Sequence, residues 1–161
     1  MRISHIDELV DFNYRVKTLV TGDQGILALL GDDPDIGPDS SEAEILEAQV
    51  KDHDYVDETS LRANAYIIID TEVVSRDTAT MKSLYLYVQV ICEKSYMALD
   101  PKKFGGLKGN RRDNLCRRID NLLNGNGDFG IGELQLKSAT IPSLPTGYTG
   151  RTLTYMVPNF A

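Results

Sequence analysis

The sequence predicts an α+β fold, because apolar residues recur at helical spacing near the N-terminus and in alternation further along the chain. Residues 65–92 and 133–157 alternate between apolar and polar side chains, as strands with one buried face do. An amphipathic helical pattern over 110–123 separates these two stretches. The chain has 161 residues, 42% of them hydrophobic and 25% charged, which suits one folded domain. We therefore predict a single domain over 1–161 with a β-β-α-β-β core over 61–161.

The first expected element is an N-terminal helix that Ser4 caps and that carries an acid, Asp7, in its first turn. Its apolar residues recur at roughly helical spacing, and Gly22 is suited to end it. The residues assigned to this apolar pattern are Ile6, Leu9, Val10 and Val16. The apolar segment 24–30 that follows predicts another turn or two of helix.

Residues 31–60 are acidic and interrupted by prolines, so we predict a long exposed arm or loop there. Residues 41–50 are the exception, because they have the pattern of a short helix. Loops of this length are usually functional or disordered, which makes the arm a candidate interface. Its candidate interface residues are Asp32, Asp33, Asp35, Asp39, Asp52, Asp54, Asp57 and Glu58.

The core is expected to contain two hairpins in a mostly antiparallel sheet of about four strands. Strands over 65–74 and 81–92 are joined by a turn at Asp77-Thr78, and strands over 133–140 and 148–157 form the second hairpin. In the second strand the residues predicted to face the core are Leu84, Leu86, Val88, Val90 and Cys92, with Tyr85, Tyr87 and Gln89 on the other face. The run from Tyr66 to Ile69 predicts burial on both faces.

The helix expected over 110–123 packs between the two hairpins. Its core face consists of Leu115, Ile119, Leu122 and Leu123. The segment from 102 to 118 is strongly basic, with Asp113 as its single acid. Its basic residues are Lys102, Lys103, Lys108, Arg111, Arg112, Arg117 and Arg118. Clustered bases can follow phosphates or meet an acidic protein surface, and both interpretations stay open.

The net charge of −7 is divided unequally along the chain. Residues 1–60 carry 15 acids and 4 bases, whereas residues 61–161 carry 9 acids and 13 bases. A solvated acidic loop beside an ordinary domain explains this division. Two complementary faces, suited to head-to-tail contacts between copies, explain it equally.

Several glycine-rich or acidic strings resemble binding motifs but stand in the wrong context. Residues 125–130 match the dinucleotide-binding spacing, yet they follow a helix and precede a strand, the reverse of what that motif needs. Residues 105–110 lack the Lys-Ser/Thr pair of a phosphate-binding loop, which indicates a hinge. The calcium-loop-like string from Asp33 has Pro38 where a glycine is required. His5 and His53 have no metal-ligand spacing.

A metal-dependent nuclease is the best enzymatic hypothesis. Asp128, Gln135 and Lys137 approximate the Asp…Glu-x-Lys spacing that holds magnesium beside a lysine, and Asp70 or Glu72 can add a carboxylate. The outward face of an alternating strand explains Gln135 and Lys137 without any such function.

Neither cysteine offers better support for catalysis. The arginines around Cys116 favour a lower pKa for its thiol, but its position on a helix beside an apolar residue predicts a packed thiol, as does the strand position of Cys92. We predict no catalytic residue, cofactor or metal site.

The order of elements from about residue 63 resembles tail-terminator and related neck proteins of long-tailed bacteriophages and of phage-derived contractile particles. The resemblance covers roughly the last 100 residues and lies in layout: a hairpin, the helix with 111–115 and 119–123, and a closing strand pair that ends on 147–155. It implies a small α+β protomer that forms a ring, commonly a hexamer, on the last ring of tail-tube subunits.

That resemblance also implies the partners and the location. The partners are other copies of the chain, the tail-tube protein, and sheath and head-connector or collar proteins. In such a ring the basic residues of 102–118 would face a neighbouring subunit or DNA that passes as cargo. The protein would lie in the host cytoplasm during assembly and then at the tail–neck junction. A nuclease and an adaptor that binds a host protein through the acidic arm are the alternative functions.

No apolar run is long enough to span a membrane.

Overall fold

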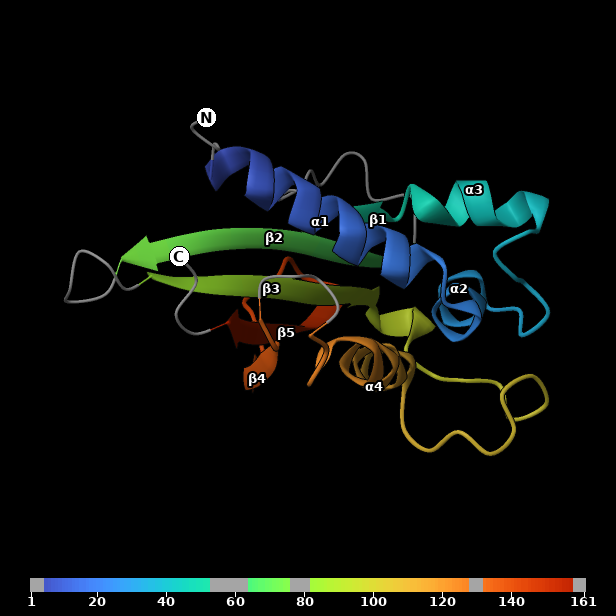
Figure 1. Ribbon diagram of the computed structural model, residues 1–161. Helices are drawn as coiled ribbons and strands as arrows, with labels where there is room; N and C mark the ends of the chain where they lie inside the picture. Colours follow the sequence, from blue (N-terminus) through green and yellow to red (C-terminus); the bar gives the residue numbers. More distant parts are fainter. Residues whose placement is uncertain (1–4, 53–63, 76–81, 128–131, 158–161) are drawn as a thin grey trace.

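A five-stranded mixed sheet in the order β1-β2-β3-β5-β4 forms the centre of the protein, seen in a computed structural model (Figure 1). The structure describes residues 5–52, 64–75, 82–127 and 132–157. β1 runs parallel to β2, and the other neighbouring pairs are antiparallel. The strands are β1 (Val50–Lys51), β2 (Ala65–Ser75), β3 (Lys82–Glu93), β4 (Gln135–Thr140) and β5 (Tyr148–Val157). The α+β class and both hairpins, β2–β3 and β4–β5, are confirmed.

The helices pack on one face of this sheet. α1 lies along β2, and α4 lies against β3 and β5, with α2 between the two helices at one end of the molecule (Figure 1). The Tyr155 hydroxyl of β5 donates a 2.8 Å hydrogen bond to Asp120 of α4, which ties that helix to the sheet. The helices are α1 (His5–Thr21), α2 (Gln24–Gly31), α3 (Ser41–Glu47) and α4 (Arg111–Leu123), with a 3-10 turn, η1, at Lys94–Tyr96.

Strand register follows the predicted alternation. Ile67 is opposite Val90 and Ile69 is opposite Val88, and all four side chains are buried under the helices. The alternate side chains of β3 point away from the helices. Among them, Tyr85 and Tyr87 stack with ring centroids 6.3 Å apart. The core face of α4 is also as predicted, since Leu115, Ile119 and Leu123 are fully buried and Leu122 packs beside them.

The far face of the sheet is covered at one end by the segment that joins β4 to β5. Tyr66, Ile68 and Ile91 are buried there, with Leu144 and Tyr148 packed against them. This second, smaller core accounts for the burial of consecutive residues in the Tyr66–Ile69 run, which the sequence predicted.

The buried face of α1 contains only part of the predicted apolar pattern. Ile6 and Val10 are 67% and 62% exposed, whereas Phe12, Val16 and Val20 are buried against the core. Phe12, Val16 and Val20 recur every fourth residue, so they form one stripe along the helix. Ile6 and Val10 belong to a different stripe that faces solvent.

The expected acidic arm is anchored to the core at several points in its described part, residues 31–52. Ile36, Ala43, Leu46 and Val50 are buried in the main core. The predicted helix ends at Glu47, and Val50 instead begins the short strand β1, whose register places it beside Ile67. Residues 31–52 are therefore an acidic, mostly solvent-facing segment that these four side chains anchor to the core. Ser4, the Asp77-Thr78 turn and residues 53–60 lie outside the described residues.

Candidate functional site

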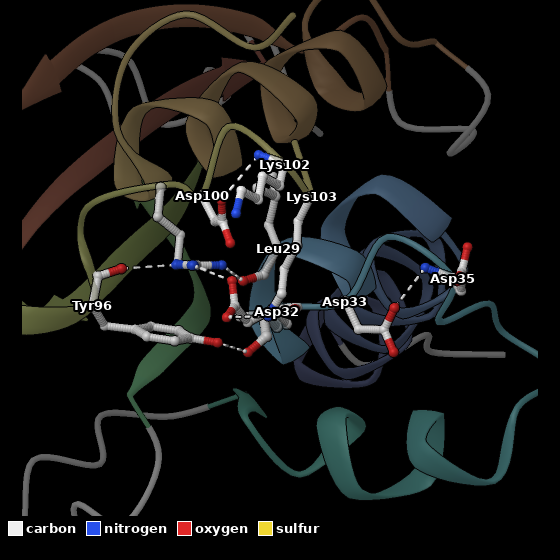
Figure 2. Close-up of polar contacts among 10 residues, drawn as sticks. Leu29, Asp32, Asp33, Asp35, Tyr96, Asp100, Lys102 and Lys103 are labelled. Atoms are coloured by element: carbon white, nitrogen blue, oxygen red, sulfur yellow. Dashed lines mark hydrogen bonds and ion pairs between the residues drawn. The ribbon is translucent and has the colours of Figure 1, made fainter. Parts of the chain in front are cut away.

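A buried arginine joins the N-terminal helices to the basic segment. Arg111 is only 1% exposed, and its guanidinium donates to the backbone oxygens of Leu29 and Tyr96 and, at 2.7 Å, to the Asp32 carboxylate. Its guanidinium also lies 3.8 Å from the centre of the Tyr96 ring, a cation–π contact. Figure 2 shows Leu29, Asp32 and Tyr96 converging on this point. The cluster fixes α2 against the start of α4.

The same cluster pairs Asp32 with two bases of its own chain. Lys103 lies 3.2 Å from Oδ2 of the Asp32 carboxylate, whereas Arg111 donates to Oδ1. Burial by itself raises the pKa of Asp32, but hydrogen bonds and charge from Arg111 and Lys103 outweigh it and hold that pKa below its ordinary value. Asp32 and Arg111 therefore stabilise the fold of their own chain. Arg111 is too deeply buried to meet another subunit or DNA, whereas an interface role for the partly exposed Asp32 stays a prediction.

Two further arginines of the basic segment have intramolecular partners. Arg118 forms a two-pronged ion pair with Asp23, with oxygens 2.6 and 3.0 Å away. Arg112 pairs with Asp113 at 3.1 Å and donates to the Thr149 hydroxyl at 2.9 Å. These contacts attach α4 to α2 and to β5, so the charges of Arg112 and Arg118 are balanced within their own chain.

Within the basic segment 102–118, all of which the structure describes, three residues remain exposed without an acidic partner: Lys102, Lys108 and Arg117. We call them the basic surface. It lies on the 97–110 segment and on the adjoining outer side of α4. Nothing in their sequence pattern separated them from their buried neighbours, because the whole segment is uniformly basic.

Five exposed carboxylates form a second charged region, the acidic surface, on and just before α3. Within the described residues none of them is ion-paired. Its residues are Asp35, Asp39, Glu42, Glu44 and Glu47. Two of them, Asp35 and Asp39, were predicted interface residues, whereas the three glutamates were not. Asp33 accepts from the backbone N–H of Asp35 at 2.9 Å, and Asp52 is exposed. Asp54, Asp57 and Glu58 lie outside the described residues.

A pocket of about 390 Å³ adjoins the basic surface. Its floor is apolar, and Arg117 and Arg118 stand at its rim, so it combines an apolar cavity with fixed positive charge. Sequence reasoning did not find this pocket, because its walls come from three separate segments. The residues that line it are Gln24, Gly25, Ala28, Leu29, Pro34, Phe104, Leu107, Asn114, Arg117 and Arg118.

The residues of the nuclease hypothesis are not brought together in the described structure. Asp70 and Glu72 lie on β2, and Gln135 and Lys137 lie on β4, with β3 and β5 between these strands. That separation is about 14 Å at the usual strand spacing, too far to share one metal ion. The described residues contain no cluster of three metal-ligating side chains. Asp128 and His53 lie outside them.

Both thiols are buried and unpaired, as predicted. Burial raises the pKa of Cys92 and of Cys116 to about 12, because a thiolate is poorly solvated there. Around Cys116 the charge of Arg151 and Arg112 favours the thiolate, yet burial outweighs it. The lowering of the Cys116 pKa that the neighbouring arginines favour does not occur.

The fold and these surfaces define an α+β protein with oppositely charged regions. A family model described as YomW matches residues 23–157, and the chain belongs to this family, which is associated with bacteriophages. The match begins after α1 and spans the whole sheet and the three other helices. No curated protein matches the chain, and no solved structure matches it. None of the helices in the described ranges is long and apolar enough to cross a membrane.

Proposed function

We propose that this phage-associated protein is a structural assembly protein of a phage or phage-like tail. In this role copies of the chain form a ring that terminates the tail tube and joins it to the neck or collar. The ring would be a hexamer, with the tail-tube protein on one side and head-connector or collar proteins on the other. Sheath would be a further partner, and DNA would pass only as cargo. The proposed role asks for surfaces that bind proteins and for no catalytic chemistry.

The observation that carries this proposal is the pair of opposite charged surfaces. After intramolecular ion pairs are formed, uncompensated acids remain around α3 and uncompensated bases remain around the 97–110 segment and α4. Figure 1 shows α3 and the 97–110 segment on opposite sides of α2. Two different, complementary surfaces on one protomer favour a head-to-tail contact, and such contacts generate closed rings when the rotation between copies closes.

Assembly with tail-tube subunits tests the function directly. The protein is mixed with tube subunits of its own phage, and light scattering and electron microscopy record the oligomeric state and the tube length. We expect a ring at one end of tubes whose growth has stopped. A protein that stays monomeric, and that leaves tube growth unchanged at equimolar or higher concentration, would contradict the proposal. Cleavage of DNA with magnesium or manganese would instead favour the nuclease.

A further inference from the structure

The pocket beside the basic surface has a composition that selects its ligand. Ala28, Leu29 and Phe104 are buried beneath it, and Leu107 at its edge is 41% exposed. An aliphatic side chain that enters such a pocket removes apolar surface from water, which is favourable. The guanidinium of Arg117 at the rim adds a preference for a negatively charged group beside that side chain.

The rim of the pocket is held in place before any ligand binds. Arg117 donates to the side-chain oxygen of Asn114, which is 2% exposed and itself donates to the backbone oxygens of Lys108 and Asn110. Across the pocket, Arg118 is fixed by Asp23, and it lies so close to α2 that a Cβ on Gly25 would be 2.5 Å from its Nε. Side chains fixed in this way lose little conformational entropy on binding, which favours affinity.

One exposed element of this chain has the matching composition. Ile45 on α3 is 69% exposed. Glu42 and Glu44 flank it on the surface of the helix, and they carry no ion pair among the described residues. The opposite side of α3 is anchored in the core by Ala43 and Leu46, so the helix presents Ile45 outward from a fixed position. An exposed large apolar side chain flanked by acids is the complement of an apolar pocket with a basic rim.

We propose that the pocket between α2, the 97–110 segment and α4 receives Ile45 from α3 of a neighbouring copy. Glu42 and Glu44 of that copy then lie opposite Arg117 and Lys108. The contact is heterologous, because α3 contributes no residue to the lining of the pocket and is therefore a different surface of the protomer. This inference rests on the proposed ring, and it names the contact between the subunits of that ring.

Cysteine cross-linking tests the contact. The double variant Ile45→Cys/Leu107→Cys is assembled with tail-tube subunits and oxidised mildly, and each single variant is the control. The native thiols do not interfere, since Cys92 and Cys116 are both buried. We expect a ladder of covalent multimers from the double variant that both single variants lack. Ile45→Ser should weaken association by at least about tenfold without unfolding the protein, because Ile45 is exposed.

The outcomes separate this inference from the proposed function. Rings that form normally, without a ladder and unaffected by Ile45→Ser, would overturn the contact and leave the ring-forming role intact. If no ring and no arrest of tube growth occur with the unmodified protein, the proposed function itself fails and the contact fails with it. A ladder together with weakened Ile45→Ser assembly supports both.

Discussion

Arg111 shows how one side chain decides the packing of three segments. Its guanidinium is buried and donates to an acid and to two backbone oxygens, so the hydrogen-bonding demand of this charge is met on several sides. A buried, satisfied arginine of this kind costs much more to remove than an exposed one, because its partners lose their donors. We therefore assign Arg111 a role in stabilising the fold.

We expect Arg111→Met to lower the free energy of unfolding by about 2–4 kcal/mol, since Asp32 and two carbonyl oxygens lose a partner. Asp32 is a third exposed, and water then replaces part of the lost contact, which holds the cost below that of a fully buried pair. Urea unfolding followed by circular dichroism measures the change. Lys102→Met is the control: its exposed side chain forms no ion pair with the described residues, so this change should alter stability by less than about 0.5 kcal/mol. Equal effects for both variants would contradict the role given to Arg111.

The lowered pKa of Asp32 leads us to expect that acid reduces the stability of the protein. Its pKa in the folded protein is below the value of about 3.9 in an unfolded chain, so its contribution is complete above that value and is lost as the pH falls through the folded pKa. Asp113 acts in the same direction. Burial raises its pKa, but Arg112 and Arg151 outweigh burial and hold that pKa below its ordinary value. We expect Asp32→Asn to be less stable than the original chain at pH 6 and to lose less stability between pH 5 and pH 2.5. Parallel curves over that range would contradict this account.

At the scale of elements, strand alternation is what made the fold predictable. Four strands, their pairing into two hairpins and the inward residues of β3 followed from a period of two, and α4 followed from its apolar stripe. β1 was missed because two residues carry no periodicity, and Val50 is a strand residue only through its partner Ile67. The contacts that anchor residues 31–52 were missed for a similar reason, since the partners of Asp32 lie 71 and 79 positions away.

The candidate site was predictable in its charge and unpredictable in its geometry. Composition alone indicated a basic region and an acidic region, and both are present. Composition could not indicate that Arg111 is buried while Arg117 is exposed, because that depends on which side of α4 faces α2. The pocket is lined by residues from three separate segments of the chain, so no local sequence pattern could predict it.

The element β5 carries a glycine that its packing requires. A Cβ on Gly150 would lie 2.7 Å from the backbone oxygen of Val90 and 2.8 Å from Leu144, which covers the far face of the sheet. We expect Gly150→Ala to destabilise the protein by about 1–3 kcal/mol, because the backbone of β3 cannot move aside cheaply. Thermal unfolding measures the effect. Gly37→Ala is the control, since a Cβ there meets no atom within 4 Å, and a neutral Gly150→Ala would show that the segment over β5 packs loosely.

For the whole molecule, the arrangement of charge determines how copies meet. The ion pairs around α2 use Asp23 and Asp32, and they leave acids uncompensated around α3 and bases uncompensated on the 97–110 segment and α4. α2 lies between α3 and the 97–110 segment (Figure 1). Exposed charges interact weakly in single pairs but steer association and fix its orientation when several act together. Assembly should therefore depend on salt more strongly than folding does.

Charge reversal on the two surfaces tests that dependence. We expect Arg117→Glu to weaken association between copies about tenfold or more at 50 mM salt, and Glu44→Arg in the same chain to restore part of it, because the two changes exchange the partners. The difference should shrink at 500 mM salt, where screening acts over only a few ångströms. Lys137→Glu on β4 is the matched control, since it reverses one exposed lysine far from both surfaces. Equal weakening by Lys137→Glu would mean that net charge, and not the position of the charges, governs assembly.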